Sequence, residues 1–139
     1  MIGYQLDLIL LRGRLPLTIQ LAMTGYNRQH IRWKAPMVGM YKLNKDAALD
    51  MRQLCVGMGL AIRDHAGNVM ATSAQRIDAS FTPQLAEAIA ILRGLQFAIE
   101  TGLFPILVES DALEVVNLVN SASEISADFG LVVCDIKDL

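Results

Sequence analysis

The stretch ILVESDALEVV, residues 106–116, decides the fold of this chain. Residues 106–108 are apolar and β-branched enough to predict a buried strand, and residues 112–119 predict a helix. Two acids, Glu109 and Asp111, lie at the junction between them. Asp111 has a local explanation as the N-cap of the helix. The other explanation is chemical: an open α/β sheet binds a metal or a substrate at the carboxyl ends of its central strands, and a carboxylate placed there can hold it.

The composition predicts one folded domain. The chain has 139 residues, of which 53% are hydrophobic and 19% are charged, which is enough apolar material for a packed core. Its formal net charge of −2 argues against a strongly basic nucleic-acid footprint, although a local basic patch remains compatible with it. Cys55 and Cys134 are far apart in the sequence, which favours buried free thiols in a reducing compartment over a disulfide.

The first 35 residues differ from the rest and predict a poorly ordered extension before a domain at residues 36–139. They contain five basic residues and one acid, without a helical or strand period, so a solvated tail is favoured over a nucleic-acid-binding arm. The apolar run LDLILLRG is too short to cross a bilayer and makes a poor signal peptide. We therefore expect an intracellular protein, nuclear or cytoplasmic, that has no membrane partner.

The element order predicts a mixed sheet. Three strands, ending near Asp46 and spanning residues 55–64 and 69–76, should form an antiparallel meander. A long helix follows, with Thr82 as its N-cap and Gly102 at its end. This helix returns the chain to a fourth strand, most simply parallel to the first. The expected fold class is α/β, with strand order 3-2-1-4 and helices packed on the sheet.

Three acids stand out against this fold. On a helical wheel, Glu87 falls in line with Ile91, Gly94 and Ala98, so it should point at the sheet. A favourable helix-dipole interaction is an alternative explanation for Glu87, and solvation at a strand end is one for Asp46.

Together these acids predict a metal site. Asp46 and Asp111 should lie side by side at the carboxyl edge of the sheet, with Glu87 approaching from the helix. Three converging carboxylates raise one another's pKa, and a hard divalent cation such as Mg²⁺ or Mn²⁺ relieves that repulsion. No histidine or cysteine accompanies them, which disfavours zinc. Glu109 is assigned to the surroundings of the site or to the surface.

Four segments, WKAPMVGMYKLNKDAA, GMGLAIRDHAGNVMAT, LAEAIAILRGLQFAIETG and ILVESDALEVVNLVN, resemble the ribonuclease H-like domain of plant proteins related to retroelement reverse transcriptases. The resemblance runs from Trp33 to the last residue. It implies a five-stranded mixed sheet and a Mg²⁺-dependent nuclease, with Mn²⁺ as a substitute, that cuts the RNA strand of RNA–DNA hybrids. It also implies that Asp46, Glu87 and Asp111 are the catalytic, metal-binding residues.

The sequence departs from this family in two places. The family's fifth strand and fourth acid would follow residue 139, so we expect a domain truncated at its C-terminus, with the outer edge of the fourth strand unpaired. Lys45 occupies a position that is usually apolar in the family; it should either destabilise the first strand or pair with one of the acids. Asp128, Asp135 and Asp138 are expected to be solvated helix charges rather than substitutes for the fourth acid.

Two functions therefore remain open. One is a hydrolase acting on RNA–DNA hybrids or other nucleic acid, and the other is a non-catalytic retroelement-derived remnant with weak or no nucleic-acid binding. The sequence does not determine the oligomeric state.

Overall fold

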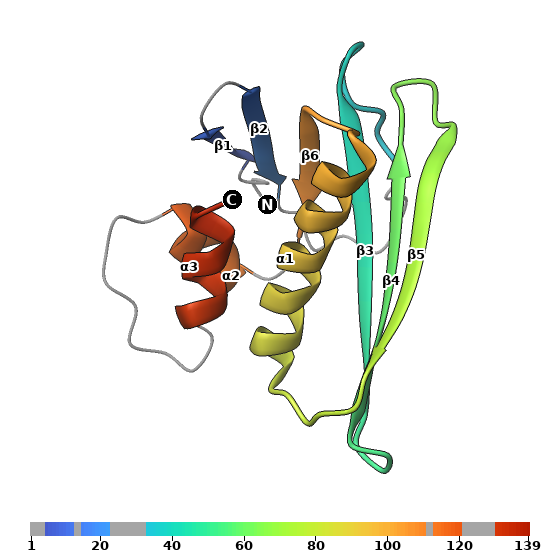
Figure 1. The fold of residues 1–139 in the computed structure, drawn as a ribbon, viewed down its shortest axis with the longest axis vertical. Helices are drawn as coiled ribbons and strands as arrows, with labels where there is room; N and C mark the ends of the chain where they lie inside the picture. The colour runs from blue at the N-terminus through green and yellow to red at the C-terminus, as the bar shows by residue number, and fades with distance from the viewer. Residues whose placement is uncertain (1–4, 13–14, 23–32, 111–112, 121–129) are drawn as a thin grey trace.

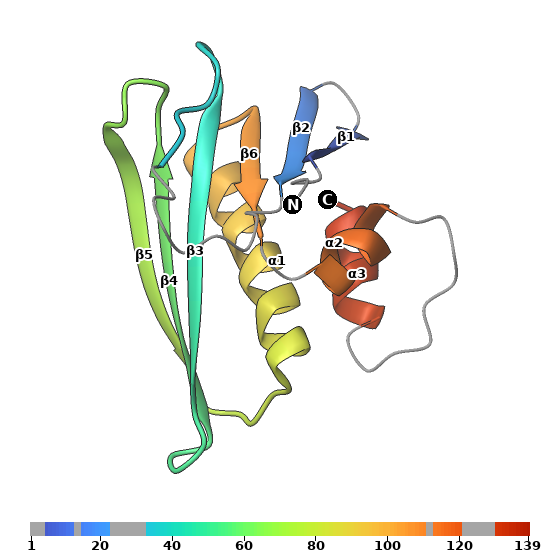
Figure 2. The same cartoon turned by 180° about the vertical axis from the view of Figure 1, so that it is seen from behind.

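The computed structural model describes residues 5–12, 15–22, 33–110, 113–120 and 130–139. They form a six-stranded mixed sheet with helices packed on one of its faces (Figures 1 and 2). The strands are β1 (Gln5–Arg12), β2 (Leu15–Ala22), β3 (Tyr41–Asp50), β4 (Cys55–Arg63), β5 (Val69–Ile77) and β6 (Ile106–Glu109). The helices are α1 (Pro83–Thr101), α2 (Leu113–Asn120) and α3 (Gly130–Lys137). The strand order is β1-β2-β6-β3-β4-β5.

The predicted sheet is confirmed. β3, β4 and β5 form the antiparallel meander, and β6 pairs with β3 in parallel, so these four strands have the order 3-2-1-4 in the numbering of the prediction. The first strand is longer than expected, because β3 continues past Asp46 to Asp50. β6 is short, and its ladder with β3 ends at the pair Leu43 and Val108. Figure 1 shows β6 ending about midway along β3.

The outer edge of β6 is paired, and the expectation of an unpaired edge was wrong. β2 lies parallel to β6, with Ile19 opposite Ile106, and β1 pairs with β2 in antiparallel register. Both strands come from the segment in which the sequence showed no strand period. The division of the chain into an extension and a domain at residue 35 stays a prediction.

The long helix has the predicted ends. The Thr82 side chain accepts a hydrogen bond of 3.2 Å from the backbone N–H of Leu85, and Pro83 occupies the first turn. Gly102 adopts a φ of 70° at the C-cap, a conformation that glycine takes without strain. The helix buries one face against β3 and β4, and Ile91 and Ala98 on that face are fully buried.

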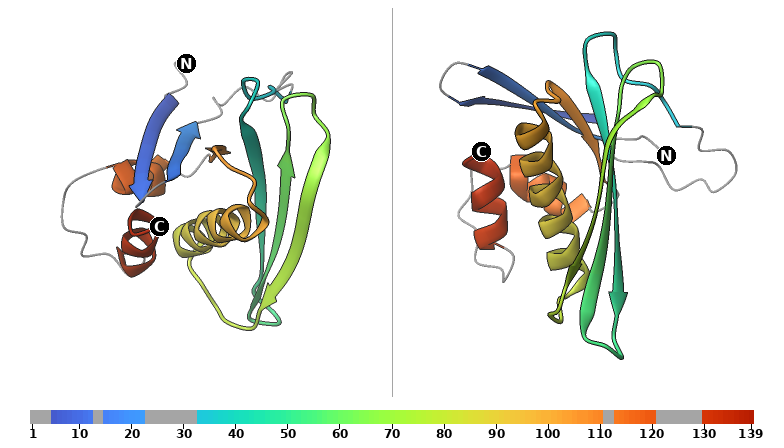
Figure 3. Two further views of the ribbon diagram at one scale, coloured as in Figure 1. Left: turned by 45° about the horizontal axis from the view of Figure 1, so that its top comes forward. Right: turned by 45° about the vertical axis from the view of Figure 1, so that its right-hand side comes forward.

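The opposite face of β3, β4 and β5 carries no helix among the described residues (Figure 3). Side chains of alternate residues on these strands are exposed there, Asp46 and Thr72 among them. We call this surface the open face. Gly57 and Gly59 lie on it, and a Cβ added to either glycine would meet no atom within 4 Å.

Several smaller expectations have mixed outcomes. Cys55 and Cys134 are both free, but only Cys55 is buried. Asp135 and Asp138 are exposed on or just after α3, as expected, whereas Asp128 lies outside the described residues. No described helix combines the length and the apolar character that crossing a bilayer requires.

Candidate active site

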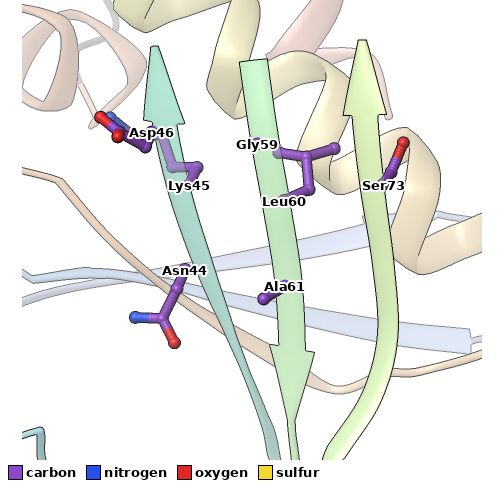
Figure 4. A pocket seen from close by; sticks show the side chains of 7 residues that line it. All are labelled: Asn44, Lys45, Asp46, Gly59, Leu60, Ala61 and Ser73. Carbon is purple, nitrogen blue, oxygen red and sulfur yellow. The ribbon is translucent and has the colours of Figure 1, made fainter. Parts of the chain in front are cut away.

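Asp46 lies on the open face near the middle of β3. Because successive side chains of a strand point to opposite faces, Asp46 shares its face with Asn44 and with its cross-strand partner Gly59. These residues line a shallow pocket of about 300 Å³ together with Lys45, Leu60, Ala61 and Ser73. In Figure 4 the Asp46 side chain points away from that of Lys45. The small side chains across β4 leave the Asp46 carboxylate accessible from solvent.

Lys45 points the other way, into the layer between the sheet and α1. Its side chain is 4% exposed and forms an ion pair and hydrogen bond with the Glu87 carboxylate, which is 25% exposed. Lys45 therefore faces the helix and pairs with one of the acids, which confirms the second of the two predicted alternatives, whereas the destabilisation of the first strand stays a prediction. A lysine this deeply buried costs free energy unless it is paired, and Glu87 supplies the opposite charge.

The packing of α1 on β3 brings this pair together. A Cβ added at Gly94 would lie 2.3 Å from Leu43 Cδ2, so the helix approaches the strand too closely there for any side chain but hydrogen. Glu87 precedes Gly94 by seven residues, which is two helical turns on the same face and about 10 Å along the axis. Lys45 follows Leu43 by two residues on the same face of the strand, about 7 Å further along. Since α1 and β3 run in opposite directions (Figure 1), Glu87 comes to lie over Lys45.

The described residues do not bring the predicted acids into one cluster. Asp46 projects from the open face and Glu87 from the helix-covered face, and Asp111 lies outside the described residues. In the described parts of the chain, no group of three or more histidine, cysteine, aspartate or glutamate side chains is arranged to hold a metal ion. The three-acid assignment therefore stays a prediction.

Asp46 and Glu87 lie on opposite faces of β3, but both lie near the part of β3 that continues beyond its ladder with β6. We call this part of the sheet the notch. The registered pairs of β6 with β3 run from Tyr41 to Leu43, and β6 ends at Glu109, whereas β3 continues to Asp50. Side chains from both faces can approach this part of β3, which lies beside the carboxyl end of the central parallel strand β6. The oxygen donors Asp46 and Glu87 suit a hard divalent cation in chemistry, but Glu87 is engaged by Lys45.

A second charged group was missed by the sequence interpretation. Lys42 is 1% exposed on the open-face side of β3, and its Nζ lies 2.5 Å from the Glu109 carboxylate and 2.7 Å from the Lys34 carbonyl oxygen. The same Nζ lies 5.5 Å from the centre of the Trp33 ring, whose indole N–H donates to Asn44. Glu109 therefore neutralises a buried lysine. Strand alternation puts Lys42 and Asp46 on one face and would have indicated this group.

Two described residues on the β4–β5 side of the sheet have shifted pKa values. The pKa of Asp64 is lowered, chiefly by a side-chain hydrogen bond from Asn68, and that of Arg76 is raised, chiefly by its hydrogen bond to Asp78. Asp64 closes the turn between β4 and β5, and Arg76 and Asp78 form an exposed pair at the end of β5. These shifts reflect local turn and surface contacts and do not mark a catalytic group.

The family model described as reverse transcriptase-like matches residues 44–139, which include both Asp46 and Glu87. The chain belongs to the reverse transcriptase-like family. No curated protein sequence matches the chain.

Two solved ribonuclease H structures are similar to this reverse transcriptase-like chain. The N-terminal ribonuclease H domain of a Mycobacterium tuberculosis protein, solved as a fusion with maltose binding protein, superposes with a TM-score of 0.60 at 20% identity, covering 71% of this chain and 72% of that one. Ribonuclease H1 of the halophilic archaeon Halobacterium salinarum gives a TM-score of 0.58 at 20% identity, covering 71% and 74%. At this identity the similarity shows a ribonuclease H-like fold.

Proposed function

We propose that this domain is a nuclease that hydrolyses the RNA strand of RNA–DNA hybrids with a divalent cation, Mg²⁺ or Mn²⁺, at the notch beside β3. The proposal extends the chain's family membership and fold to the chemistry of three carboxylates, Asp46, Glu87 and Asp111. A plant retroelement origin for the domain belongs to the same proposal and rests on the sequence resemblance.

The observation that carries the proposal is the parallel register of β6 on β3. The last registered pair is Leu43 with Val108, and Asp46 and Asp111 each follow their member of that pair by three residues. If the register of β6 on β3 continued for three more residues, positions 46 and 111 would be neighbours at the notch. Two aspartates at such a position favour cation binding because each raises the cost of leaving the other ionised.

Asp46, Glu87 and Asp111 would hold the cation, which supplies an activated water and charge stabilisation when bound. Asp46 offers its carboxylate from the open face, where the small residues of β4 leave room for a nucleic-acid backbone. Glu87 would contribute from the helix side once released from Lys45. A nucleic acid suits this site as a substrate. The bound cation is positive, so the negatively charged sugar–phosphate backbone can approach the carboxylates.

The test is cleavage of a labelled RNA–DNA hybrid by the wild-type chain and by Asp46→Asn, with Mg²⁺ or Mn²⁺ present. Asp46→Asn should lower the rate by at least about 100-fold, because the substitution removes a charged cation ligand at nearly constant size. Asp50→Asn is the matched control: Asp50 lies on the same strand and face, but its carboxylate caps the backbone N–H groups of Arg52 and Gln53. Equal cleavage by the wild type and Asp46→Asn would contradict the proposal.

One observation favours the second candidate, a non-catalytic remnant that binds nucleic acid weakly or not at all. Lys45 neutralises Glu87, so the described fold balances this acid without a metal ion. If the domain is such a remnant, the wild-type chain should not cleave the hybrid with any divalent cation. Hybrid binding measured by fluorescence anisotropy then separates a binding module from an inert fold.

A further inference from the structure

The Lys45–Glu87 pair is built into the core of the domain. Leu43 and Ala47, on either side of Lys45 along the same face of β3, both pack in the hydrophobic core. Ala86 and Ala88, on either side of Glu87 in α1, are 2% and 0% exposed. The ammonium and the carboxylate thus meet between two closely packed elements, where their attraction is less screened than at a surface.

We propose that Lys45 is an internal counter-cation that competes with a divalent cation for Glu87 and thereby sets the cation affinity of the site. This inference rests on the proposed role of Glu87 as a cation ligand. A divalent cation can engage Glu87 only if the Lys45 ammonium moves away, because two positive centres on one carboxylate repel each other strongly in this environment. The domain is then held in a state of low cation affinity until the lysine is displaced.

Lys45 is suited to this competition in a way that a surface lysine is not. Its side chain is 4% exposed, so α1 and β3 hold it near Glu87 and little freedom is lost when the pair forms. The lysine stem has several rotatable bonds, so its ammonium can move away from Glu87 without a change in the backbone.

The first experiment measures Mn²⁺ affinity by isothermal titration calorimetry for the wild type, Lys45→Met, Lys45→Arg and Lys45→Met/Glu87→Gln. Lys45→Met keeps the side-chain length and removes the charge, so its Kd for Mn²⁺ should fall by at least about tenfold. Lys45→Arg keeps the charge and should stay within about twofold of the wild type. The gain should disappear in the double variant, because the released carboxylate is then absent.

A Kd for Lys45→Met that equals that of the wild type would overturn the inference. The same gain in the double variant would also overturn it, because the lysine would then act through another acid. If circular dichroism shows that Lys45→Met does not fold, Lys45→Gln, which can still hydrogen-bond to Glu87, replaces it in the same series.

The second experiment uses the unmodified chain and does not depend on a variant. Acetic anhydride labels accessible lysines, and mass spectrometry reports labelling at each position. Lys45 should label slowly without a divalent cation and at least about threefold faster with saturating Mn²⁺. The exposed Lys34 and the buried Lys42 are internal controls whose labelling should not change. Unchanged Lys45 labelling in a chain shown to bind Mn²⁺ would overturn the inference.

These outcomes separate the inference from the proposed function. If Lys45→Met binds Mn²⁺ tightly but does not cleave a hybrid, the competition between Lys45 and the cation for Glu87 is supported and the proposed hydrolase activity is refuted. Cleavage by the wild type that Glu87→Gln abolishes, with no effect of Lys45→Met on Mn²⁺ affinity, would refute the competition and keep the hydrolase.

Discussion

The substitution Gly94→Ala tests the contact that positions α1 over β3. The added Cβ would lie 2.3 Å from Leu43 Cδ2, 3.3 Å from its Cγ and 3.4 Å from its Cδ1. Leu43 is fully buried, so its side chain cannot turn away into solvent. Overpacking of this kind costs about 1–3 kcal/mol, whereas replacing glycine by alanine inside a helix contributes about 1 kcal/mol of stability. The net result is a loss of up to about 2 kcal/mol in the free energy of unfolding.

The assay is urea unfolding followed by circular dichroism, with thermal unfolding as a second measure. A loss of about 2 kcal/mol lowers Tm by about 7 °C for a domain of this length. The control is the same substitution in a Leu43→Ala background, where the overlap is gone and Gly94→Ala should stabilise the protein by up to about 1 kcal/mol. Stabilisation by Gly94→Ala in the wild-type background would refute the close approach of α1 to β3. The geometric account of why Glu87 meets Lys45 would then fail with it.

Two further predictions concern the ends of elements. Thr82→Ala removes the side-chain acceptor for the Leu85 N–H and should lower the free energy of unfolding by about 1 kcal/mol in urea titrations, with Thr82→Ser as the conservative control that retains the cap. Asp64, whose pKa is lowered from its ordinary value of 3.8 chiefly by a hydrogen bond from Asn68, stabilises the fold above that value and loses this contribution as pH falls through its lower folded pKa. Asp64→Leu should therefore be less stable than the wild type at pH 6, with a smaller difference at pH 2.5, and an equal difference at both pH values would contradict the account.

The sequence alone determined the features whose causes are local. Thr82 and Gly102 were predicted as the ends of α1 because a cap requires only a suitable side chain or a permitted φ within one turn. The order of the four central strands followed from short turns and one helical crossover, which leave few possible topologies. Glu87 was correctly predicted to face the sheet because helical periodicity alone decides which residues share a face with Ile91 and Ala98.

Only the tertiary structure decided which charges meet. The sequence placed Asp46 and Glu87 together from topology, but strand alternation turns Asp46 to the open face and Lys45 to the helix, and the close packing at Gly94 then brings Glu87 to the lysine. The apolar residues Leu43 and Leu49 indicate which side of β3 faces inward, but the partner of Lys45 depends on how α1 packs on the strand.

β2 shows the remaining limit of the sequence. Its pairing with β6 joins Leu15–Ala22 to a strand more than 80 residues later in the chain. Such a pairing depends on an edge that exists only after the central sheet has formed, so a local pattern gives no signal for it. The sequence thus determined the four central strands and the ends of α1, whereas long-range packing decided the edge of the sheet and the partner of each buried charge.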